Sequence, residues 1–208
     1  MVLYGAVDSN SWKVLKKVYA RLKFLYRKSK FLDFNTRKLL ASALIQCHYD
    51  YACSYWYKSL TRRTKSKLQI SQNTLIRFVL NLHPRTHISY THFKQLGWLP
   101  IEQRVEQLKL NHVYKVLNGN APSYLSDHFS LTSSRHSYNT RSSSSSIYIP
   151  TFNTQSQHSF RLSGAKIWNS LPSCIRNVSS LQLFKKSVKA FMYEKLSELE
   201  ESEFVYLL

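Results

Sequence analysis

Cysteine is scarce in this sequence, and its spacing is unpaired. Cys47, Cys53 and Cys174 are the three cysteines among 208 residues. An odd number without a Cys-x-x-Cys pair predicts neither a disulfide framework nor a structural zinc site. His48 and His112 could join the cysteines as zinc ligands, but without such a pair we expect no metal and no other cofactor. We expect the thiols to be reduced and mostly buried.

Long apolar runs are also missing. None approaches the roughly 18–20 residues that a helix needs to cross a bilayer. A signal peptide has a basic segment followed by an apolar segment, and the first residues, MVLYGAVDSN, lack this pattern. We therefore expect an intracellular protein, in the nucleus or the cytoplasm, with no membrane partner. We find no internal repeat of about 20–50 residues, which argues against a solenoid.

Acidic residues are few relative to basic ones. The chain has 11 Asp and Glu against 30 Lys and Arg, for a formal net charge of +19. So large a charge exceeds what solubility requires and repels the chain's own compact state, so we expect a polyanionic partner. The hydrophobic content of 43% is nevertheless enough for a real core. The length allows one domain, or a domain with an appendage.

Apolar residues at helical spacing dominate residues 1–129. The spacing predicts helices over residues 12–27, 36–56, 67–82 and 100–118, and a short one over 122–129. A charged turn is expected over residues 58–67. The residues expected to face inward in the first three helices are Val14, Leu15, Val18, Leu22 and Leu25, then Leu39, Leu40, Ala43, Leu44 and Cys47, then Leu68, Leu75, Ile76, Val79 and Leu82.

The rest of the chain begins with a change of composition. Residues 130–146 are rich in Ser and Thr with few apolar side chains, which predicts a mobile linker. A short strand is expected over residues 147–150, one or two helical turns over 164–171, and a last helix over 180–199. The expected fold is mainly α: a helical bundle over residues 1–129, the linker over 130–146, and a small α-rich region with one or two short strands over 147–208.

Eight short segments of the sequence resemble segments of a known protein family. They are LKFLYRKSKFL (22–32), LIQCHYDYACSYWY (44–57), LQISQNTLIRFVLNL (68–82), LGWLPIEQRV (96–105), YKVLNGNAPSYLSDHF (114–129), HSYNTRS (136–142), FRLSGAKIWNSLPSCIR (160–176) and SLQLFKKSVKAF (180–191). Over residues 13–196 the chain resembles the region after the polymerase palm in non-LTR retrotransposon reverse transcriptases of the jockey-like and chicken-repeat-like groups. The resemblance implies that the first region is thumb-like. Two departures are Cys47, where the family suggests proline, and a shortened link to the palm at the amino terminus.

The catalytic acids of such an enzyme are missing. Reverse transcription needs three carboxylates that hold two Mg²⁺ ions about 4 Å apart. The resemblance implies that two of them form an adjacent Asp pair after an aromatic residue. The aspartates here, Asp8, Asp33, Asp50 and Asp127, are far apart and none adjoins another acid. The chain alone is therefore expected to be no polymerase and no endonuclease, and the missing palm region of a full-length parent is a candidate partner.

Basic residues of the first helix and of the following charged turn form the expected contact surface. The resemblance implies that a thumb grips the template-primer duplex by its backbone, and Lys and Arg neutralise phosphates with little regard to sequence. The alternative is a merely solvated basic face. The residues that we expect to bind RNA, DNA or RNA-DNA hybrid are Lys13, Lys16, Lys17, Arg21, Lys23, Arg27 and Lys28 in the helix and Arg62, Arg63, Lys65 and Lys67 in the turn.

Aromatic residues cluster at the end of the second predicted helix. Tyr49, Tyr51, Tyr55, Trp56 and Tyr57 could stack unpaired bases, because an aromatic face accepts any base. Large aromatics at helical spacing more often face inward, so we favour core packing for this cluster. Outside it, Trp98 and Trp168 are also expected in the core.

Three functions fit these observations. The leading hypothesis is a non-catalytic nucleic-acid-binding fragment derived from an RNA-directed DNA polymerase. The second is a helical protein-interaction or scaffold module whose charge is incidental, and the third is a decayed reading frame without selected function. A titration with RNA and hybrid duplex across salt concentrations separates the first from the second.

Overall fold

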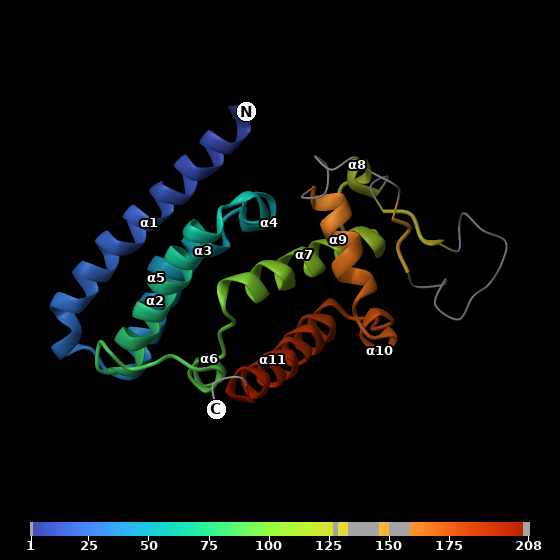
Figure 1. The fold of residues 1–208 in the computed structure, drawn as a ribbon. Coiled ribbons are helices and arrows are strands. Elements are labelled where there is room, and N and C mark those ends of the chain that lie inside the picture. Colours follow the sequence, from blue (N-terminus) through green and yellow to red (C-terminus); the bar gives the residue numbers. More distant parts are fainter. Residues whose placement is uncertain (1, 127–128, 133–145, 150–158, 206–208) are drawn as a thin grey trace. The chain divides into compact units, whose positions relative to one another are not determined.

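The computed structural model describes the chain apart from residues 1, 127–128, 133–145, 150–158 and 206–208, and apart from the side chains of 2–10 and 199–205 (Figure 1). The described residues are mainly helical, as predicted. They form two compact units, one of the described residues up to 105 together with those from 196 onward, and one of those between 106 and 195. The first unit carries all the basic residues predicted to bind nucleic acid.

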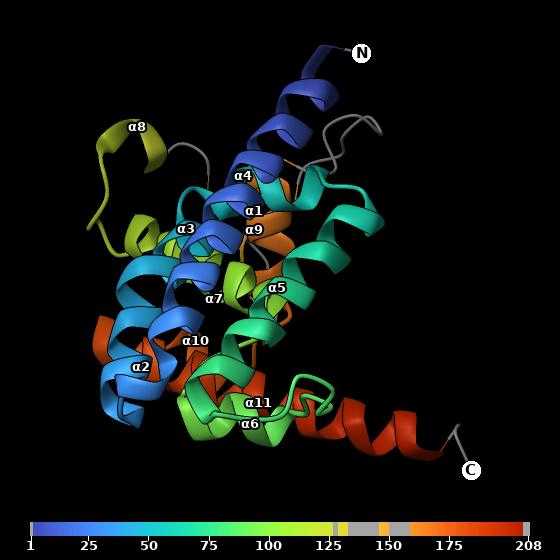
Figure 2. The ribbon, with the colours of Figure 1, turned by 90° about the vertical axis from the view of Figure 1, so that its left-hand side faces the viewer.

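Three long stretches of helix build the first unit. Helix α1 (Val2–Lys28) packs along α5 (Arg62–Leu80) and contacts α3 (Cys47–Asp50) (Figure 2). The short η1 (Ser29–Phe31) leads into α2 (Phe34–Ala41), which also packs on α5. The buried apolar side chains described in α1 are Leu15, Val18, Leu22 and Leu25. The predicted amphipathic helix is therefore confirmed, except that Val14 is only half-buried.

The predicted helix over residues 36–56 is wrong as a single element. After α2 the chain makes a π-helical segment (Ser42–Gln46), then α3, and breaks before α4 (Cys53–Trp56) and a 3₁₀ turn (Tyr57–Ser59). The buried apolar residues of this stretch are Ala41, Ile45, Tyr49, Cys53 and Tyr57, at a constant spacing of four.

That spacing explains the interruptions. In an α-helix, residues four apart drift by about 40° around the axis at each step, so an unbroken helix cannot keep all of them inward. A wider π turn and a break with Ala52 in the left-handed region (φ 50°) restore the alignment. Of the residues expected inward, Leu39, Ala43 and Cys47 are exposed instead.

The predicted charged turn is also wrong, because Arg62 to Lys67 form the first turns of α5. Thr61 is the N-cap, and its hydroxyl accepts a hydrogen bond from the Thr64 amide at 3.3 Å. The helix ends where Asn81 adopts a left-handed conformation (φ 55°). Buried side chains of α5 include four that were predicted: Leu68, Leu75, Ile76 and Val79.

Polar contacts fix the start of α7 (Ile101–Leu117) within the first unit. Gln69 of α5 accepts a hydrogen bond from the Ile101 amide at 3.1 Å, and the buried Gln72 amide donates to the Leu99 carbonyl at 2.9 Å. Arg104 forms a two-point ion pair with Asp50, with distances of 3.0 and 2.7 Å. The missed helix α6 (Tyr90–Leu96) precedes α7 and ends at Gly97 (φ 69°).

The second unit contains most of α7, α8 (Ser123–Ser126), α9 (Phe160–Asn169), α10 (Ser173–Arg176) and most of α11 (Leu181–Val205). Its core stacks Phe184 on Tyr114 at 4.3 Å and on Trp168 at 5.7 Å, between ring centroids. A Cβ on Gly164 would lie 3.1 Å from Val113, so glycine lets α9 approach α7 closely.

A single antiparallel bridge takes the place of the predicted strand. Leu131 pairs with Ile147, and within the described residues no longer ladder forms. The predicted mobile linker lies mostly outside the described residues, as does Pro150. The boundary between the compact units falls inside α7, not at the linker, and the division at residue 129 stays a prediction.

Candidate nucleic-acid interface

The basic residues of α1 lie in two stripes. Lys16, Lys23 and Arg27 are exposed and lie opposite the buried Val18 and Leu22 around the helix axis. They have no role in the core, so a phosphate backbone could lie against them without rearranging the helix.

The second stripe faces the π segment and α3. It consists of Lys13, Lys17 and Arg21, which are spaced four residues apart. Arg21 donates a hydrogen bond to the Leu44 carbonyl at 2.7 Å and so helps to hold the π segment in place. Its contribution is in part structural, whereas the sequence predicted only phosphate contact. Lys28 is exposed in the last turn of α1, where a cation also stabilises the helix dipole.

The first turns of α5 supply the other predicted basic residues. Arg62 and Arg63 are exposed, and no acidic residue lies in the first turn. The amino terminus of a helix carries a partial positive charge. The cations here add to that charge, so this end of α5 has a strong positive potential. Lys65 Nζ lies 5.2 Å from the ring of Tyr57.

One contact joins the two basic elements. Lys67 Nζ of α5 lies 4.5 Å from the centre of the Trp12 ring of α1. This contact links the start of α5 to the side of α1 that carries Trp12. Sequence reasoning missed Trp12, whose contact with α5 exists only in the fold.

Two acidic side chains near this surface are already paired. Asp50 is bound by Arg104, and the Glu102 carboxylate lies 3.6 Å from Lys58 Nζ. Neither pair involves a residue of the α1 stripes or of the first turns of α5. The positive charge of those residues therefore remains available to a polyanion.

The aromatic cluster divides between core and surface. Tyr49 and Tyr57 are buried, as predicted, and the Tyr49 hydroxyl hydrogen-bonds the Ser71 hydroxyl at 2.8 Å. Tyr51 and Tyr55 are 79% and 58% exposed, so core packing was wrong for them. Of the other two predicted anchors, Trp168 is buried and Trp98 is half-buried.

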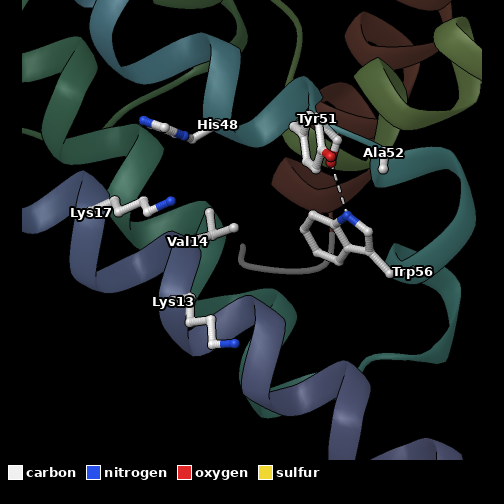
Figure 3. Close-up of a pocket in the computed structure, with 7 residues that line it drawn as sticks. All are labelled: Lys13, Val14, Lys17, His48, Tyr51, Ala52 and Trp56. Atoms are coloured by element: carbon white, nitrogen blue, oxygen red, sulfur yellow. Dashed lines mark hydrogen bonds between the residues drawn. The ribbon is translucent and has the colours of Figure 1, made fainter.

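A pocket of about 220 Å³ opens between α1 and the break after α3 (Figure 3). Tyr51 and Trp56 lie together on one side, and Lys17 and His48 on the other, with Val14 between them. Its lining consists of Lys13, Val14, Lys17, His48, Tyr51, Ala52 and Trp56.

The break after α3 shapes the aromatic side of the pocket. Because Ala52 is left-handed, the chain turns back and the Trp56 indole nitrogen donates to the Tyr51 carbonyl at 3.0 Å. This bond satisfies the polar edge of the indole and holds the ring in place. No sequence signal indicated the break, because alanine rarely adopts that conformation.

His48 is the titratable group of the pocket whose charge the surroundings alter. Burial lowers the pKa of His48 below 6.5, and the positive charges of Arg21 and Lys17 lower it further. The imidazole is therefore neutral near pH 7. Its Nε2 is buried with no hydrogen-bond partner, and such orphaned groups require an explanation.

Comparison of the chain with protein-family models, with curated proteins and with solved structures finds no match. The function is therefore inferred from the residues themselves.

Metal-binding clusters and membrane spans are both absent from the described residues. In that part of the chain no three His, Cys, Asp or Glu side chains gather where they could hold a metal ion. Of the helices described, none is both long and apolar enough to cross a membrane. Cys53 is buried, but Cys47 and Cys174 are exposed, so the expectation of mostly buried thiols was wrong.

Proposed function

We propose that this chain is a non-catalytic nucleic-acid-binding fragment, derived from a non-LTR retrotransposon reverse transcriptase, that grips RNA or RNA-DNA hybrid by its phosphates. The observation that carries the proposal is the set of exposed basic residues on α1 and at the start of α5, two helices that the contact of Lys67 with Trp12 links. A net charge of +19 and an acid-free start to α5 favour binding to a polyanion. The proposed origin is based on the eight segments that resemble the region after the polymerase palm.

The test removes charge without disturbing the core. Replacement of Lys16, Lys17, Lys23 and Arg27 by Gln keeps good helix formers at exposed positions, so the helix should persist. Affinity for hybrid duplex should fall, and the slope of log affinity against log salt should shrink by about 0.9 for each phosphate that is no longer neutralised. Fluorescence anisotropy titrations at several salt concentrations measure both.

A matched control makes the same charge change in the second unit. Four exposed lysines of α9 and α11 can be replaced by Gln in the same way: Lys166, Lys185, Lys186 and Lys195. If the α1 variant stays helical by circular dichroism and binds with unaltered affinity and salt slope, α1 does not contact phosphates. Absence of binding by the unmodified protein would instead favour a scaffold module.

A further inference from the structure

The pocket beside α1 combines two kinds of chemistry that meet in a nucleotide. Lys13 and Lys17 offer cations to a phosphate, and Tyr51 and Trp56 offer aromatic faces to a base (Figure 3). At about 220 Å³ it is smaller than the roughly 300–1,000 Å³ of sites for drug-sized ligands, so it suits one small group. A duplex is far too wide for it.

The aromatic side is arranged to receive a flat ring. Tyr51 is 79% exposed, and the indole of Trp56 is held by its bond to the Tyr51 carbonyl. A base inside a duplex has both faces covered by its neighbours, whereas an unpaired base has a free face. The pocket chemistry therefore favours a nucleotide outside the duplex.

The pocket also adjoins the proposed phosphate-binding surface. Lys13 and Lys17 belong to α1, where Lys13 lies three residues before Lys16 of the outward stripe and is therefore its neighbour on the helix surface. A strand that follows the outward stripe would bring its next phosphate to the pocket. Ala52, in a strained left-handed conformation, shapes the opposite side, and strained backbone concentrates at binding sites.

We infer that this pocket holds one unpaired nucleotide of a strand bound to the α1–α5 surface, with its phosphate on Lys13 and Lys17 and its base against Tyr51 and Trp56. The inference rests on the proposed function and adds a preference for junctions between duplex and single strand. Stacking of one base adds at least about fivefold in affinity.

The test compares one hybrid duplex in three forms, by anisotropy with the full chain. The first form has blunt ends, the second has a short single-stranded overhang, and the third has the same overhang without its bases. Each overhang is tested once at a 5′ end and once at a 3′ end. The overhang should lower Kd by at least about fivefold relative to the blunt duplex. The base-free overhang should lose most of that gain, because it retains only the phosphates.

Two matched pairs of variants locate the effect. Tyr51→Leu should abolish the gain from bases, whereas Tyr55→Leu, at an exposed tyrosine outside the pocket, should retain it. Lys13→Gln and Lys16→Gln make the same charge change on one helix, and only Lys13→Gln should reduce the ratio of blunt to overhang Kd. Tyr51→Leu keeps the backbone carbonyl that Trp56 uses, so the break should survive.

The outcomes separate the two proposals. If the protein binds the blunt duplex and an overhang does not lower the Kd, this inference is overturned and the proposed function stands. An overhang gain that Tyr51→Leu retains in full places the base elsewhere and also overturns it. Failure to bind any form of the duplex overturns the proposed function itself.

Discussion

His48 is a side chain whose surroundings set its charge. Burial, helped by Arg21 and Lys17, lowers its folded pKa below 6.5, so protonation is less favourable in the folded state than in the unfolded state. The unfolded chain then binds more protons between these two pKa values. The stability that neutral His48 contributes is therefore complete above about pH 6.5 and is lost as the pH falls through the folded pKa.

We predict that the free energy of unfolding falls as the pH is lowered below about 6.5, and that His48→Gln makes the fall shallower. Urea unfolding at a series of pH values between about 8 and 5 measures the slope. His87→Gln, at an exposed histidine, is the control and should leave the slope as it is. An unchanged slope in His48→Gln would show that this imidazole has no part in the acid response.

At the scale of elements, prediction succeeded where the apolar spacing fits a regular helix. Leu15, Val18, Leu22 and Leu25 follow the three-and-four spacing of an α-helix, and α1 formed as expected. The prediction failed for the stretch that begins at α2, because its buried apolar residues repeat every four positions and a continuous α-helix cannot bury all of them.

The candidate site was predictable only in part. The basic stripes could be read from the sequence because they follow from one helix and its period. The contact of Lys67 with Trp12 and the pocket at Tyr51 depend on how α1 packs against later elements, which a linear pattern does not contain. The missed cap at Thr61 had a local signal, a hydroxyl residue just before the helix.

Substitutions at Ala52 test whether the chain breaks there or continues as a helix, because the two cases predict different effects on the free energy of unfolding. In the left-handed region a Cβ costs about 1–2 kcal/mol and a β-branched side chain more. We predict that Ala52→Val lowers the free energy of unfolding by about 1–2 kcal/mol, whereas Ala52→Gly leaves it unchanged or raises it. Urea titrations of the two variants measure the difference. In a continuous helix Gly would be the worse of the two, by the order of helix propensities, and that result would contradict the break.

For the whole molecule, the reactivity of the cysteine thiols provides a measure of folding. Cys53 is 1% exposed, and burial raises its pKa to about 11, while Cys47 and Cys174 are exposed. Because the thiolate is the reactive form, we predict that two thiols react quickly with a disulfide reagent at neutral pH and the third reacts only as the protein opens. Absorbance of the released thiol, with and without urea, counts them. Cys53→Ser should remove the slow phase alone, and three equally fast thiols would mean that the first unit is open around Cys53.

The tryptophans make binding visible without a label. Trp12 lies under Lys67 in the basic surface and Trp56 lines the pocket, while Trp168 is buried in the core of the second unit. A base that stacks on an indole quenches its emission, and a phosphate that draws Lys67 away from Trp12 changes the emission of that ring. The protein therefore carries its own optical probes of ligand occupancy, and Trp56→Phe and Trp12→Phe separate the signal of the pocket from that of the phosphate surface.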